Sequence, residues 1–436
     1  MSNTIQKITN SLESLIDELS SNPSLYLKNP NTNFSRNRKI DFKTFVGITL
    51  NSGGCTMSKE LLDYFDFDIN TPTVSAYCQQ RSKVLPDAFE YLFHSFTEAN
   101  LINPRTYDGY RLIACDGSNL TIPSNKHDFS TLKRSNQSID STGNHLHLNA
   151  FYDVLNRVYV DTLVQKYCDF HESKACVEMI ERSRIQDVIL VADRNYEFYN
   201  LIAHATNKNW KYVIRIKDSL KGGIASGLVL PGTGAFDKDF SITFSRKNTK
   251  QVKEKGYKYL SSSTTFDYLP RKSNDTYTLS FRIARFAISD DTYEMVITNL
   301  DKQSFPIAKL KEIYKLRWGI ETSFRELKYS MGLTNFHSKK VEYIEQEIYS
   351  RLLLYNYCEL ITAHVVENMK KSEETKQVNF TVAISICREF FRKKRNLSPP
   401  DVIKLIEKYT LPLRPGRKDP RKVKTQSAVS FLYRVA

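Results

Sequence analysis

The chain lacks long apolar runs, and none of its 436 residues lie in a stretch approaching the roughly 20 apolar residues that a membrane-spanning helix needs. Its polar start, MSNTIQKITNSLESL, also lacks the apolar region of a secretory signal peptide. These absences argue against an integral membrane protein and a secreted one. We therefore expect a protein that stays inside the cell and has no membrane partner.

Cysteine and histidine occur, but not in the patterns that build disulfide frameworks or zinc sites. The seven cysteines include no Cys-x-x-Cys pair, and the short motifs His145-x-His147 and Cys168-x-x-His171 have no matching second half. The simpler interpretation is structural: His145 and His147 are alternating residues of a strand, and His171 stands at the start of a helix. We predict reduced, mostly buried thiols and no structural zinc.

Acidic residues are outnumbered, with 48 Asp and Glu against 63 Lys and Arg, which gives a formal net charge of +15. Such a surplus suits a polyanionic partner, although charge alone does not separate nucleic acid from a membrane surface. Two stretches concentrate it: Arg246, Lys247, Lys250, Lys253, Lys255 and Lys258, and the tail residues Arg414, Arg417, Lys418, Arg421 and Lys422. Both could follow a DNA backbone, and a solvated charged face explains them equally well.

The first part of the chain, residues 1–105, has helical periodicity interrupted by loops. The segment SKELLDYFDFD and residues 71–96 predict two helices around a turn, the second opening with Thr71-Pro72 at its cap. Arg81, Lys83 and the basic cluster Arg36-Arg38-Lys39 make this region a candidate for specific DNA binding. An ordinary helical subdomain is the alternative.

Strand patterns replace the helical ones at about residue 106. YRLIACDGSNLTIP predicts one strand, and NHLHLNAFYDVLNRVYVDTLVQK predicts a pair around a Leu155-Asn156 turn. A helix beginning near His171, the apolar run of DVILVADRNY, another helix and the strand KYVIRIK follow, as in a mixed α/β sheet. We therefore predict an α/β core over residues 106–217.

Residues 218–302 break this rhythm with Gly-rich turns and β-type segments, and we interpret them as a β-rich insertion. A long helix from Ile307 to about Met331 then resumes the core, which we extend over residues 303–340. Residues 341–436 predict a helical C-terminal region with a basic tail. Its apolar helix Ile344 to Val366 is either a dimer interface or part of the internal core.

Two aspartates follow apolar strand runs, where α/β sheets place their active sites. Asp116 comes after Leu112-Ile113-Ala114-Cys115, and Asp193 comes after VILVA. We expect each to end its strand. Strand-end aspartates are also common turn formers, so each alone is weak evidence for catalysis.

The segment KEIYKLRWGIETSFRELKYSMGL carries four polar residues at intervals of three, four and seven: Tyr314, Arg317, Glu321 and Lys328. At about 100° per residue they fall within roughly 60° of one another on a helix. An apolar stripe lies about a quarter-turn away: Leu316, Ile320, Phe324 and Leu327. Taken alone, the polar stripe fits an exposed face with an Arg317-Glu321 ion pair.

The pattern Tyr-x2-Arg-x3-Glu-x6-Lys is the signature of one group of bacterial insertion-sequence transposases with a DDE active site, and all four of its positions are present here. The sequence resembles that family over most of its length, with the aspartates in CDGSNLTIP and ADRNYEFYN. The resemblance implies a ribonuclease-H-like mixed sheet core with a β-rich insertion between the second Asp and the Glu, flanked by helical regions. The position of residues 218–302 agrees with it.

The resemblance also implies a chemistry and partners. Asp116, Asp193 and Glu321 would be both the catalytic residues and the ligands of two Mg²⁺ ions, with Mn²⁺ as a substitute, because hard cations prefer carboxylate oxygens. The expected reaction is excision and insertion of the element by phosphodiester hydrolysis and strand transfer, cut-and-paste through hairpin ends. The expected partners are terminal inverted repeats, target DNA and a second copy of the chain in a synaptic complex, in the bacterial cytoplasm at the nucleoid.

Other residues are candidates for DNA contact rather than for chemistry. Tyr314, Arg317 and Lys328 suit phosphate binding beside Glu321. Trp318 is a candidate for base stacking or for a core or cation–π role, and Arg194 for a phosphate or for a salt bridge. Two alternatives to the transposase remain: a ribonuclease-H-like nuclease that cuts without joining, and an inactive or repurposed transposase that only binds DNA.

Overall fold

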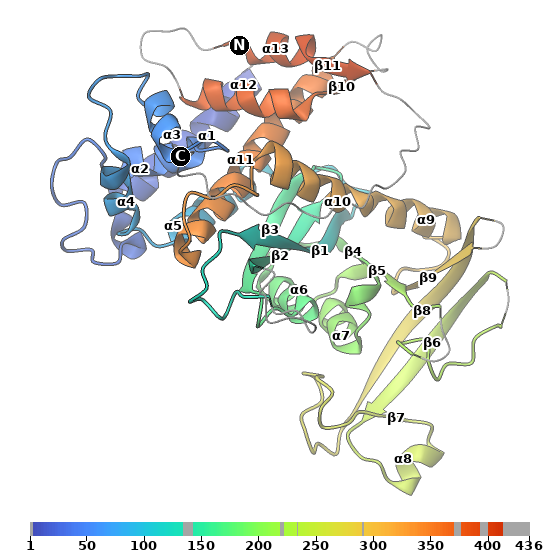
Figure 1. The fold of residues 1–436 in the computed structure, drawn as a ribbon. Coiled ribbons are helices and arrows are strands. Elements are labelled where there is room, and N and C mark those ends of the chain that lie inside the picture. The colour runs from blue at the N-terminus through green and yellow to red at the C-terminus, as the bar shows by residue number, and fades with distance from the viewer. Residues whose placement is uncertain are drawn as a thin grey trace.

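The computed structural model describes residues 3–133, 143–218, 222–232, 234–289, 292–369, 376–392 and 400–412. Through these ranges runs a mixed sheet in the order β3-β2-β1-β4-β5-β9-β8-β6-β7 (Figure 1). The strands are β1 (Arg111–Ile122), β2 (Asn144–Asp153), β3 (Val158–Lys166), β4 (Val188–Ala192), β5 (Lys211–Ile216), β6 (Phe236–Ser245), β7 (Lys258–Tyr259), β8 (Thr276–Ser289) and β9 (Thr292–Thr298).

Helices cover both faces of this sheet (Figure 1). The α-helices are α1 (Asn3–Ser21), α2 (Phe42–Asn51), α3 (Met57–Tyr64), α4 (Val74–Arg81), α5 (Asp87–Asn100), α6 (Glu172–Arg182), α7 (Tyr199–Asn207), α8 (Lys250–Glu254), α9 (Ile307–Leu316), α10 (Trp318–Arg325), α11 (Val341–Asn368), α12 (Phe380–Arg392) and α13 (Val402–Lys408). Shorter elements are the 3-10 turns η1 (Pro23–Tyr26) and η2 (Arg194–Tyr196), the π-turn η3 (Glu326–Ser330), and the strand pair β10 (Lys376–Val378) and β11 (Thr410–Pro412).

The α/β prediction for residues 106–217 is confirmed. β1, β4 and β5 run parallel, while β2 is antiparallel to both β1 and β3. The predicted hairpin turns between β2 and β3, where Arg157 has a φ of +56°. Helix α6 begins as expected after His171, whose side chain accepts a hydrogen bond from the Lys174 amide.

The segment predicted as a β-rich insertion extends the same sheet instead of forming a separate one. β9 pairs antiparallel with β5, β8 with β9, and β6 with β8. Figure 1 shows these long strands reaching away from the core, with α8 near their far end. The core strands and the insertion therefore share one continuous hydrogen-bonded sheet.

Two helix predictions need correction. The single helix expected over residues 71–96 is two, α4 and α5, with Pro86 just before α5; α4 is capped by Thr73, whose side chain accepts from the Ala76 amide, and not by Thr71. The long helix expected from Ile307 changes at Arg317, between α9 and α10, and ends in the π-turn η3.

Helix α11 is enclosed by the molecule. It contacts α1, α2, α5, α12 and β3, and most of its residues from Ile344 to Val365 are buried. This supports the second of the two readings of that apolar helix, because a helix packed on so many sides offers little free surface. A dimer interface along α11 is therefore not supported.

The cysteine prediction is confirmed: all seven thiols are free and four of them are buried. Within the described ranges, no helix combines the length and apolarity needed to cross a membrane. The basic tail residues from Arg414 to Lys422 lie outside the described residues.

Candidate active site

Two carboxylates stand side by side where β1 and β4 run parallel. Cys115 of β1 pairs with Ala192 of β4. The residues that follow them in the sequence, Asp116 and Asp193, are therefore neighbours. Asp193 directly follows β4, as expected, and its side chain accepts from the Asn195 amide at 2.8 Å. Asp116 does not end its strand, because β1 continues to Ile122 in its antiparallel pairing with β2.

Glu321 reaches the same place from α10, which packs over β1. Ile320 and Phe324 of α10 share one apolar cluster with Ala114 and Leu120 of β1. Side chains alternate along a strand, so Asp116 points to the face that α10 covers. The apolar neighbours of Glu321 thus anchor its helix beside Asp116.

The charges around Asp116 are consistent with this placement. Burial raises the pKa of Asp116 to about 7, and the carboxylates of Asp193 and Glu321 act in the same direction. The Gly117 backbone amide, which donates to Asp116 Oδ1 at 2.8 Å, and the Arg317 guanidinium oppose the rise. Three acidic groups therefore interact electrostatically at one point of the sheet, with Arg317 as the nearby positive charge.

Arg317 lies at the junction of α9 and α10 and binds Glu321. Its Nη2 donates to Glu321 Oε1 at 2.7 Å. Although burial opposes it, the hydrogen bond and charge of Glu321 raise the pKa of Arg317. The guanidinium also lies 5.6 Å from the ring centroid of Tyr314 and 5.1 Å from that of Trp318, whose side chain is 56% exposed.

The other two residues of the predicted polar stripe have different surroundings. Tyr314 is only 4% exposed, so the expectation that it lies on an open phosphate-binding face is not met. Lys328 lies on η3, and its Nζ donates to the backbone oxygen of Asn119 in β1 at 2.8 Å. Burial lowers the pKa of Lys328. Lys328 therefore ties the π-turn to the strand that carries Asp116.

Arg81, predicted to contact DNA, is instead buried inside the protein at 2% exposure. Its guanidinium donates to Glu347 at 2.7 Å, to Gln346 at 3.1 Å and to the Tyr343 carbonyl. A side chain with these partners cannot reach a phosphate. The correction is that Arg81 joins α4 to α11.

Two residues of the basic stretch 246–258 are also held internally. Arg246 donates to backbone oxygens of Leu269, Ser261, Thr264 and Phe266, and Lys258 Nζ donates to the Tyr199 hydroxyl at 3.0 Å. Lys247, Lys250, Lys253 and Lys255 of the same stretch, and Arg194 beside Asp193, are exposed. The DNA contacts proposed for these exposed residues stay predictions.

The backbone beside Asp116 is packed more tightly than the sequence alone indicates. His147 of β2 donates from Nδ1 to Asn119 Oδ1 at 2.7 Å, and its Nε2 lies 3.1 Å from Glu172 Oε1 at the start of α6. A Cβ placed on Gly117 would overlap both His147 Nε2 and Glu172 Oε1. The glycine directly after Asp116 was the available signal.

Among the residues that the structure describes, no three Asp, Glu, His or Cys side chains are grouped closely enough to enclose a metal ion. The donor chemistry nevertheless fits a hard divalent cation, since Asp116, Asp193 and Glu321 all offer carboxylate oxygens. The raised pKa of Asp116 shows that its negative charge is poorly compensated by the protein alone. Glu321 is engaged by Arg317, so a cation would compete with that guanidinium for it.

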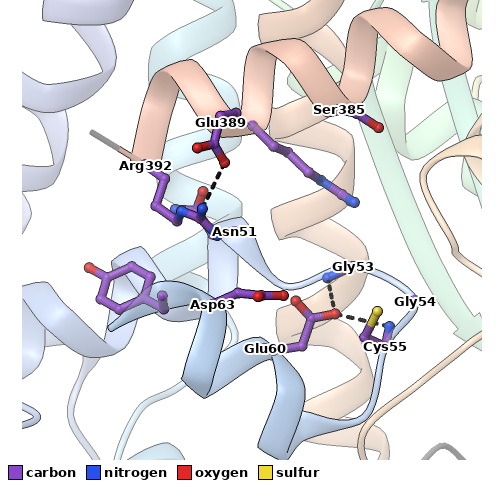
Figure 2. A pocket seen from close by; sticks show the side chains of 11 residues that line it. Asn51, Gly53, Gly54, Cys55, Glu60, Asp63, Ser385, Glu389 and Arg392 are labelled. Atoms are coloured by element: carbon purple, nitrogen blue, oxygen red, sulfur yellow. Dashed lines mark hydrogen bonds and ion pairs between the residues drawn. The ribbon is translucent and has the colours of Figure 1, made fainter. Parts of the chain in front are cut away.

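A separate pocket of about 220 Å³ lies between α3 and α12, and none of the three carboxylates lines it (Figure 2). Most of its charged groups already have partners. Glu60 accepts from the Gly53 and Cys55 amides, and Arg392 donates to Glu389 at 2.7 Å. The half-buried Arg388 donates to the Met331 carbonyl at 3.4 Å. Charges of both signs meet there, so this pocket favours neither an anion nor a cation.

Comparison with known proteins gives a family match. A family model described as "Transposase DDE domain" matches residues 107–357, which include all three carboxylates. The transposase InsG for insertion sequence element IS4, from Escherichia coli strain K12, is 29% identical over 133 residues. That match covers 28% of this chain and 30% of InsG, so it spans under a third of the relative's length.

One solved structure resembles the chain at low identity. It is a piggyBac transposase synaptic complex with hairpin DNA, with a TM-score of 0.41 and 11% sequence identity. The alignment covers 96% of this chain and 85% of that one.

Proposed function

The chain belongs to the transposase DDE domain family, and on that premise we propose that it is a DNA transposase whose Asp116, Asp193 and Glu321 cut and rejoin the ends of an insertion sequence. The observation that supports the proposal is the electrostatic influence of Asp193 and Glu321, from separate elements, on Asp116, although the three carboxylates are not grouped closely enough in the described residues to enclose a metal ion. Asp116 and Asp193 are neighbours across β1 and β4, and both Asp193 and Glu321 act on the pKa of Asp116.

The sheet supports a ribonuclease-H-like core. In the strand order β3-β2-β1-β4-β5, β2 runs antiparallel to both of its neighbours. Asp116 lies on β1, the central strand of these five, and Asp193 directly follows β4, the strand beside it. We propose residues 106–217 and 303–340 as this core and residues 218–302 as its insertion. Residues 1–105 would bind the element end, and residues 341–436 would form the C-terminal helical region.

Asp116, Asp193 and Glu321 would hold two Mg²⁺ ions, or Mn²⁺ in their place. Two such ions about 4 Å apart stabilise charge on the attacking and leaving oxygens of a phosphodiester. Arg317 donates its hydrogen bond to Oε1 of Glu321. To bind a metal ion together with the two aspartates, Glu321 would have to break this hydrogen bond or use its other oxygen, Oε2, for the ion.

The other residues of the site would position DNA. Arg317 is a planar donor near the rings of Tyr314 and Trp318. It is 5% exposed, so it could bind a phosphate only if Glu321 moved away from it. Trp318, being exposed beside it, would stack on a base. Lys328 acts indirectly, since its ammonium holds the Asn119 carbonyl and fixes η3 against β1.

The proposed reaction follows the family resemblance. Water attacks a phosphorus at the element end, and the P–O bond to the 3′ oxygen breaks, which leaves a 5′-phosphate and a free 3′-hydroxyl. That hydroxyl attacks the opposite strand to give a hairpin end, water reopens the hairpin, and the 3′-hydroxyl then attacks target DNA. Each step exchanges one phosphodiester oxygen for another, so no oxidant or covalent protein intermediate is needed.

The partners in this proposal are the element's terminal inverted repeats, the target duplex and a second copy of the chain. Two ends must be held together before joining, which calls for a homodimeric synaptic complex. Its place would be the bacterial cytoplasm, at the nucleoid when DNA is bound.

The test uses the element's own ends, read from the DNA that flanks the gene. A labelled duplex ending in the terminal repeat is incubated with the full chain and Mg²⁺, and nicks, hairpins and joined products are separated. We expect all three products from the native chain and none from Glu321→Gln, which should still bind DNA. Nicks without hairpins or joining would favour a ribonuclease-H-like nuclease, and DNA binding without any cutting would favour the repurposed DNA-binding protein.

A further inference from the structure

A pocket of about 300 Å³ lies in the N-terminal helical region, between the loop that precedes α2 and the end of α4. The residues that line it are Asn31, Thr32, Phe34, Ser35, Arg36, Arg38, Ile40, Gln80 and Lys83. Three of them are cations and none is an acid. The pocket therefore has a single sign of charge, unlike the one between α3 and α12.

The loop is shaped so that its arginines and Lys83 share this hollow. Phe34 adopts a φ of +58°, a left-handed conformation that bulky residues rarely take. Its ring packs edge-on against Phe42 at 5.5 Å between centroids, and Lys83 Nζ lies 5.3 Å from the centre of the same ring. The aromatic ring thus fixes the turn and one wall of the pocket together.

Lys83 is held in place but not neutralised. Its Nζ donates to Oε1 of Gln80, a side chain that is 4% exposed, at 2.8 Å. Burial lowers the pKa of Lys83, and the charges of Arg38 and Arg36 lower it further. In the described part of the chain, neither these two arginines nor Lys83 forms an ion pair with a carboxylate. The three cations repel one another, and an anion between them would relieve that repulsion.

We infer that this pocket binds a backbone phosphate of duplex DNA, through Arg36, Arg38 and Lys83. Arginine offers a planar fork of donors and lysine a compact charge, and the two together are typical of phosphate contacts. The contact reads no base, so it fixes the position of the helical region on a duplex without selecting the sequence. The inference rests on the proposed function, because that function supplies the DNA.

Arg81 gives an internal contrast two residues before Lys83. Its charge is matched by Glu347 in the interior, whereas the three pocket cations face an opening and have no acid to match them. Arg36, Arg38 and Lys83 can therefore meet a phosphate in the pocket, whereas Arg81 cannot.

The experiment measures DNA binding as a function of salt, in EDTA, so that no cutting occurs. The probe is a fluorescently labelled short duplex of arbitrary sequence, titrated with the full chain between about 50 and 200 mM salt. For the native chain and the double variant Arg36→Gln/Arg38→Gln, log K is plotted against log salt. Lys7→Gln, which removes an exposed charge of α1 outside the pocket, is the matched control.

We expect the double variant to bind more weakly at low salt and to lose about one from the magnitude of the slope, because the pocket holds one phosphate and each phosphate contact contributes about 0.9. Lys7→Gln should leave the slope unchanged. Both arginines are exposed, so the double variant should fold, and an unchanged melting temperature verifies this. An unchanged slope in the folded double variant would overturn the inference.

A second arm separates DNA from other phosphate sources. Calorimetric titration with inorganic phosphate should give no saturable binding, and a single-stranded RNA probe should show no loss of slope in the double variant. Two results would contradict a DNA site. One is saturable binding of inorganic phosphate by the native chain but not by the double variant. The other is a double variant whose slope falls with the RNA probe and stays unchanged with the DNA probe. Because no metal is present, a negative result here leaves cutting at Asp116 untouched, and a chain that never cuts can still pass this test.

Discussion

Arg317 donates a hydrogen bond to Glu321 at 2.7 Å, four residues along the chain, where α9 meets α10. The carboxylate that the family resemblance assigns to metal binding is therefore engaged by a cation of the protein itself. A guanidinium group and a divalent cation bind to the same carboxylate oxygens. We therefore expect Arg317 and the metal ion to compete for Glu321.

Replacing Arg317 should therefore tighten metal binding while it weakens DNA contact. We expect Arg317→Gln to bind Mn²⁺ about two- to fivefold more tightly, because a partly exposed ion pair contributes about 0.5 to 1 kcal/mol. Calorimetric titration with Mn²⁺ measures this. Arg325→Gln, an exposed residue at the end of the same helix, is the control and should bind Mn²⁺ as the native chain does. Weaker Mn²⁺ binding in Arg317→Gln would mean that Arg317 organises the site instead of competing for it.

The buried Asp116 should make stability depend on pH. Its pKa in the folded protein is about 7, above the ordinary value of 3.8, so the folded state holds this proton more tightly than the unfolded chain does. This contribution to stability is fully present below about pH 4 and is lost as the pH rises through about 7. Asp116→Asn removes the loss, so at about pH 8 it should be more stable than the native chain by about 2 to 4 kcal/mol.

Urea unfolding at about pH 4 and about pH 8 measures this difference between Asp116→Asn and the native chain. The control is Asp239→Asn, which replaces an exposed carboxylate of β6. Added Mg²⁺ should stabilise the native chain at the higher pH and leave Asp116→Asn unchanged. If the difference in the free energy of unfolding between Asp116→Asn and the native chain is the same at both pH values, the pKa of Asp116 is not raised in the folded protein.

Because His147 and Glu172 pack closely against Gly117, we expect that a larger residue at this position destabilises the protein. A methyl group there would overlap His147 Nε2 and Glu172 Oε1, so Gly117→Ala should destabilise the fold by about 1 to 3 kcal/mol through overpacking. Gly319 is the matched control, since a Cβ there lies 3.6 Å from Val154 Cγ1, an ordinary contact. Gly319→Ala should be neutral or stabilising by up to about 1 kcal/mol, because it removes a helical glycine. Equal melting temperatures for the two variants would rule out this packing.

Arg81 should matter for stability and not for DNA. Removing it leaves Glu347 with fewer partners in the interior, so we expect Arg81→Ala to lose about 3 to 5 kcal/mol. Arg36→Ala, at an exposed arginine, should stay within about 0.5 kcal/mol of the native chain. Denaturant unfolding compares the two. A mild effect of Arg81→Ala would show that His337 and Arg351, which also contact Glu347, compensate for it.

Local patterns were enough to predict the core strands. The alternation in β2 and β3 and the apolar run before Asp193 name the elements correctly, because each depends on residues within a few positions. The cap at His171 is equally local. What the patterns could not show is where β1 ends, since its continuation past Asp116 is held by pairing with β2.

Long-range partners account for the other errors. Arg81 looks like a surface cation until α11 supplies Glu347 from far along the chain. The polar stripe on the Glu321 helix was predicted from ideal geometry, and the change of helix at Arg317 and the π-turn at Lys328 shift its members into different surroundings. The family signature, and not the local pattern, led to the prediction of Glu321, while the burial of Tyr314 depends on the fold.

The most direct test of the central claim is Mn²⁺ binding, measured by calorimetry on the native chain and on Asp116→Asn, Asp193→Asn and Glu321→Gln. If the three carboxylates act as one site, the native chain binds Mn²⁺ saturably and each variant loses that binding. Glu312→Gln, an exposed carboxylate of α9, should bind like the native chain. Native-like binding by any one of the three variants would contradict the account, because a carboxylate that can be removed without effect does not hold the metal.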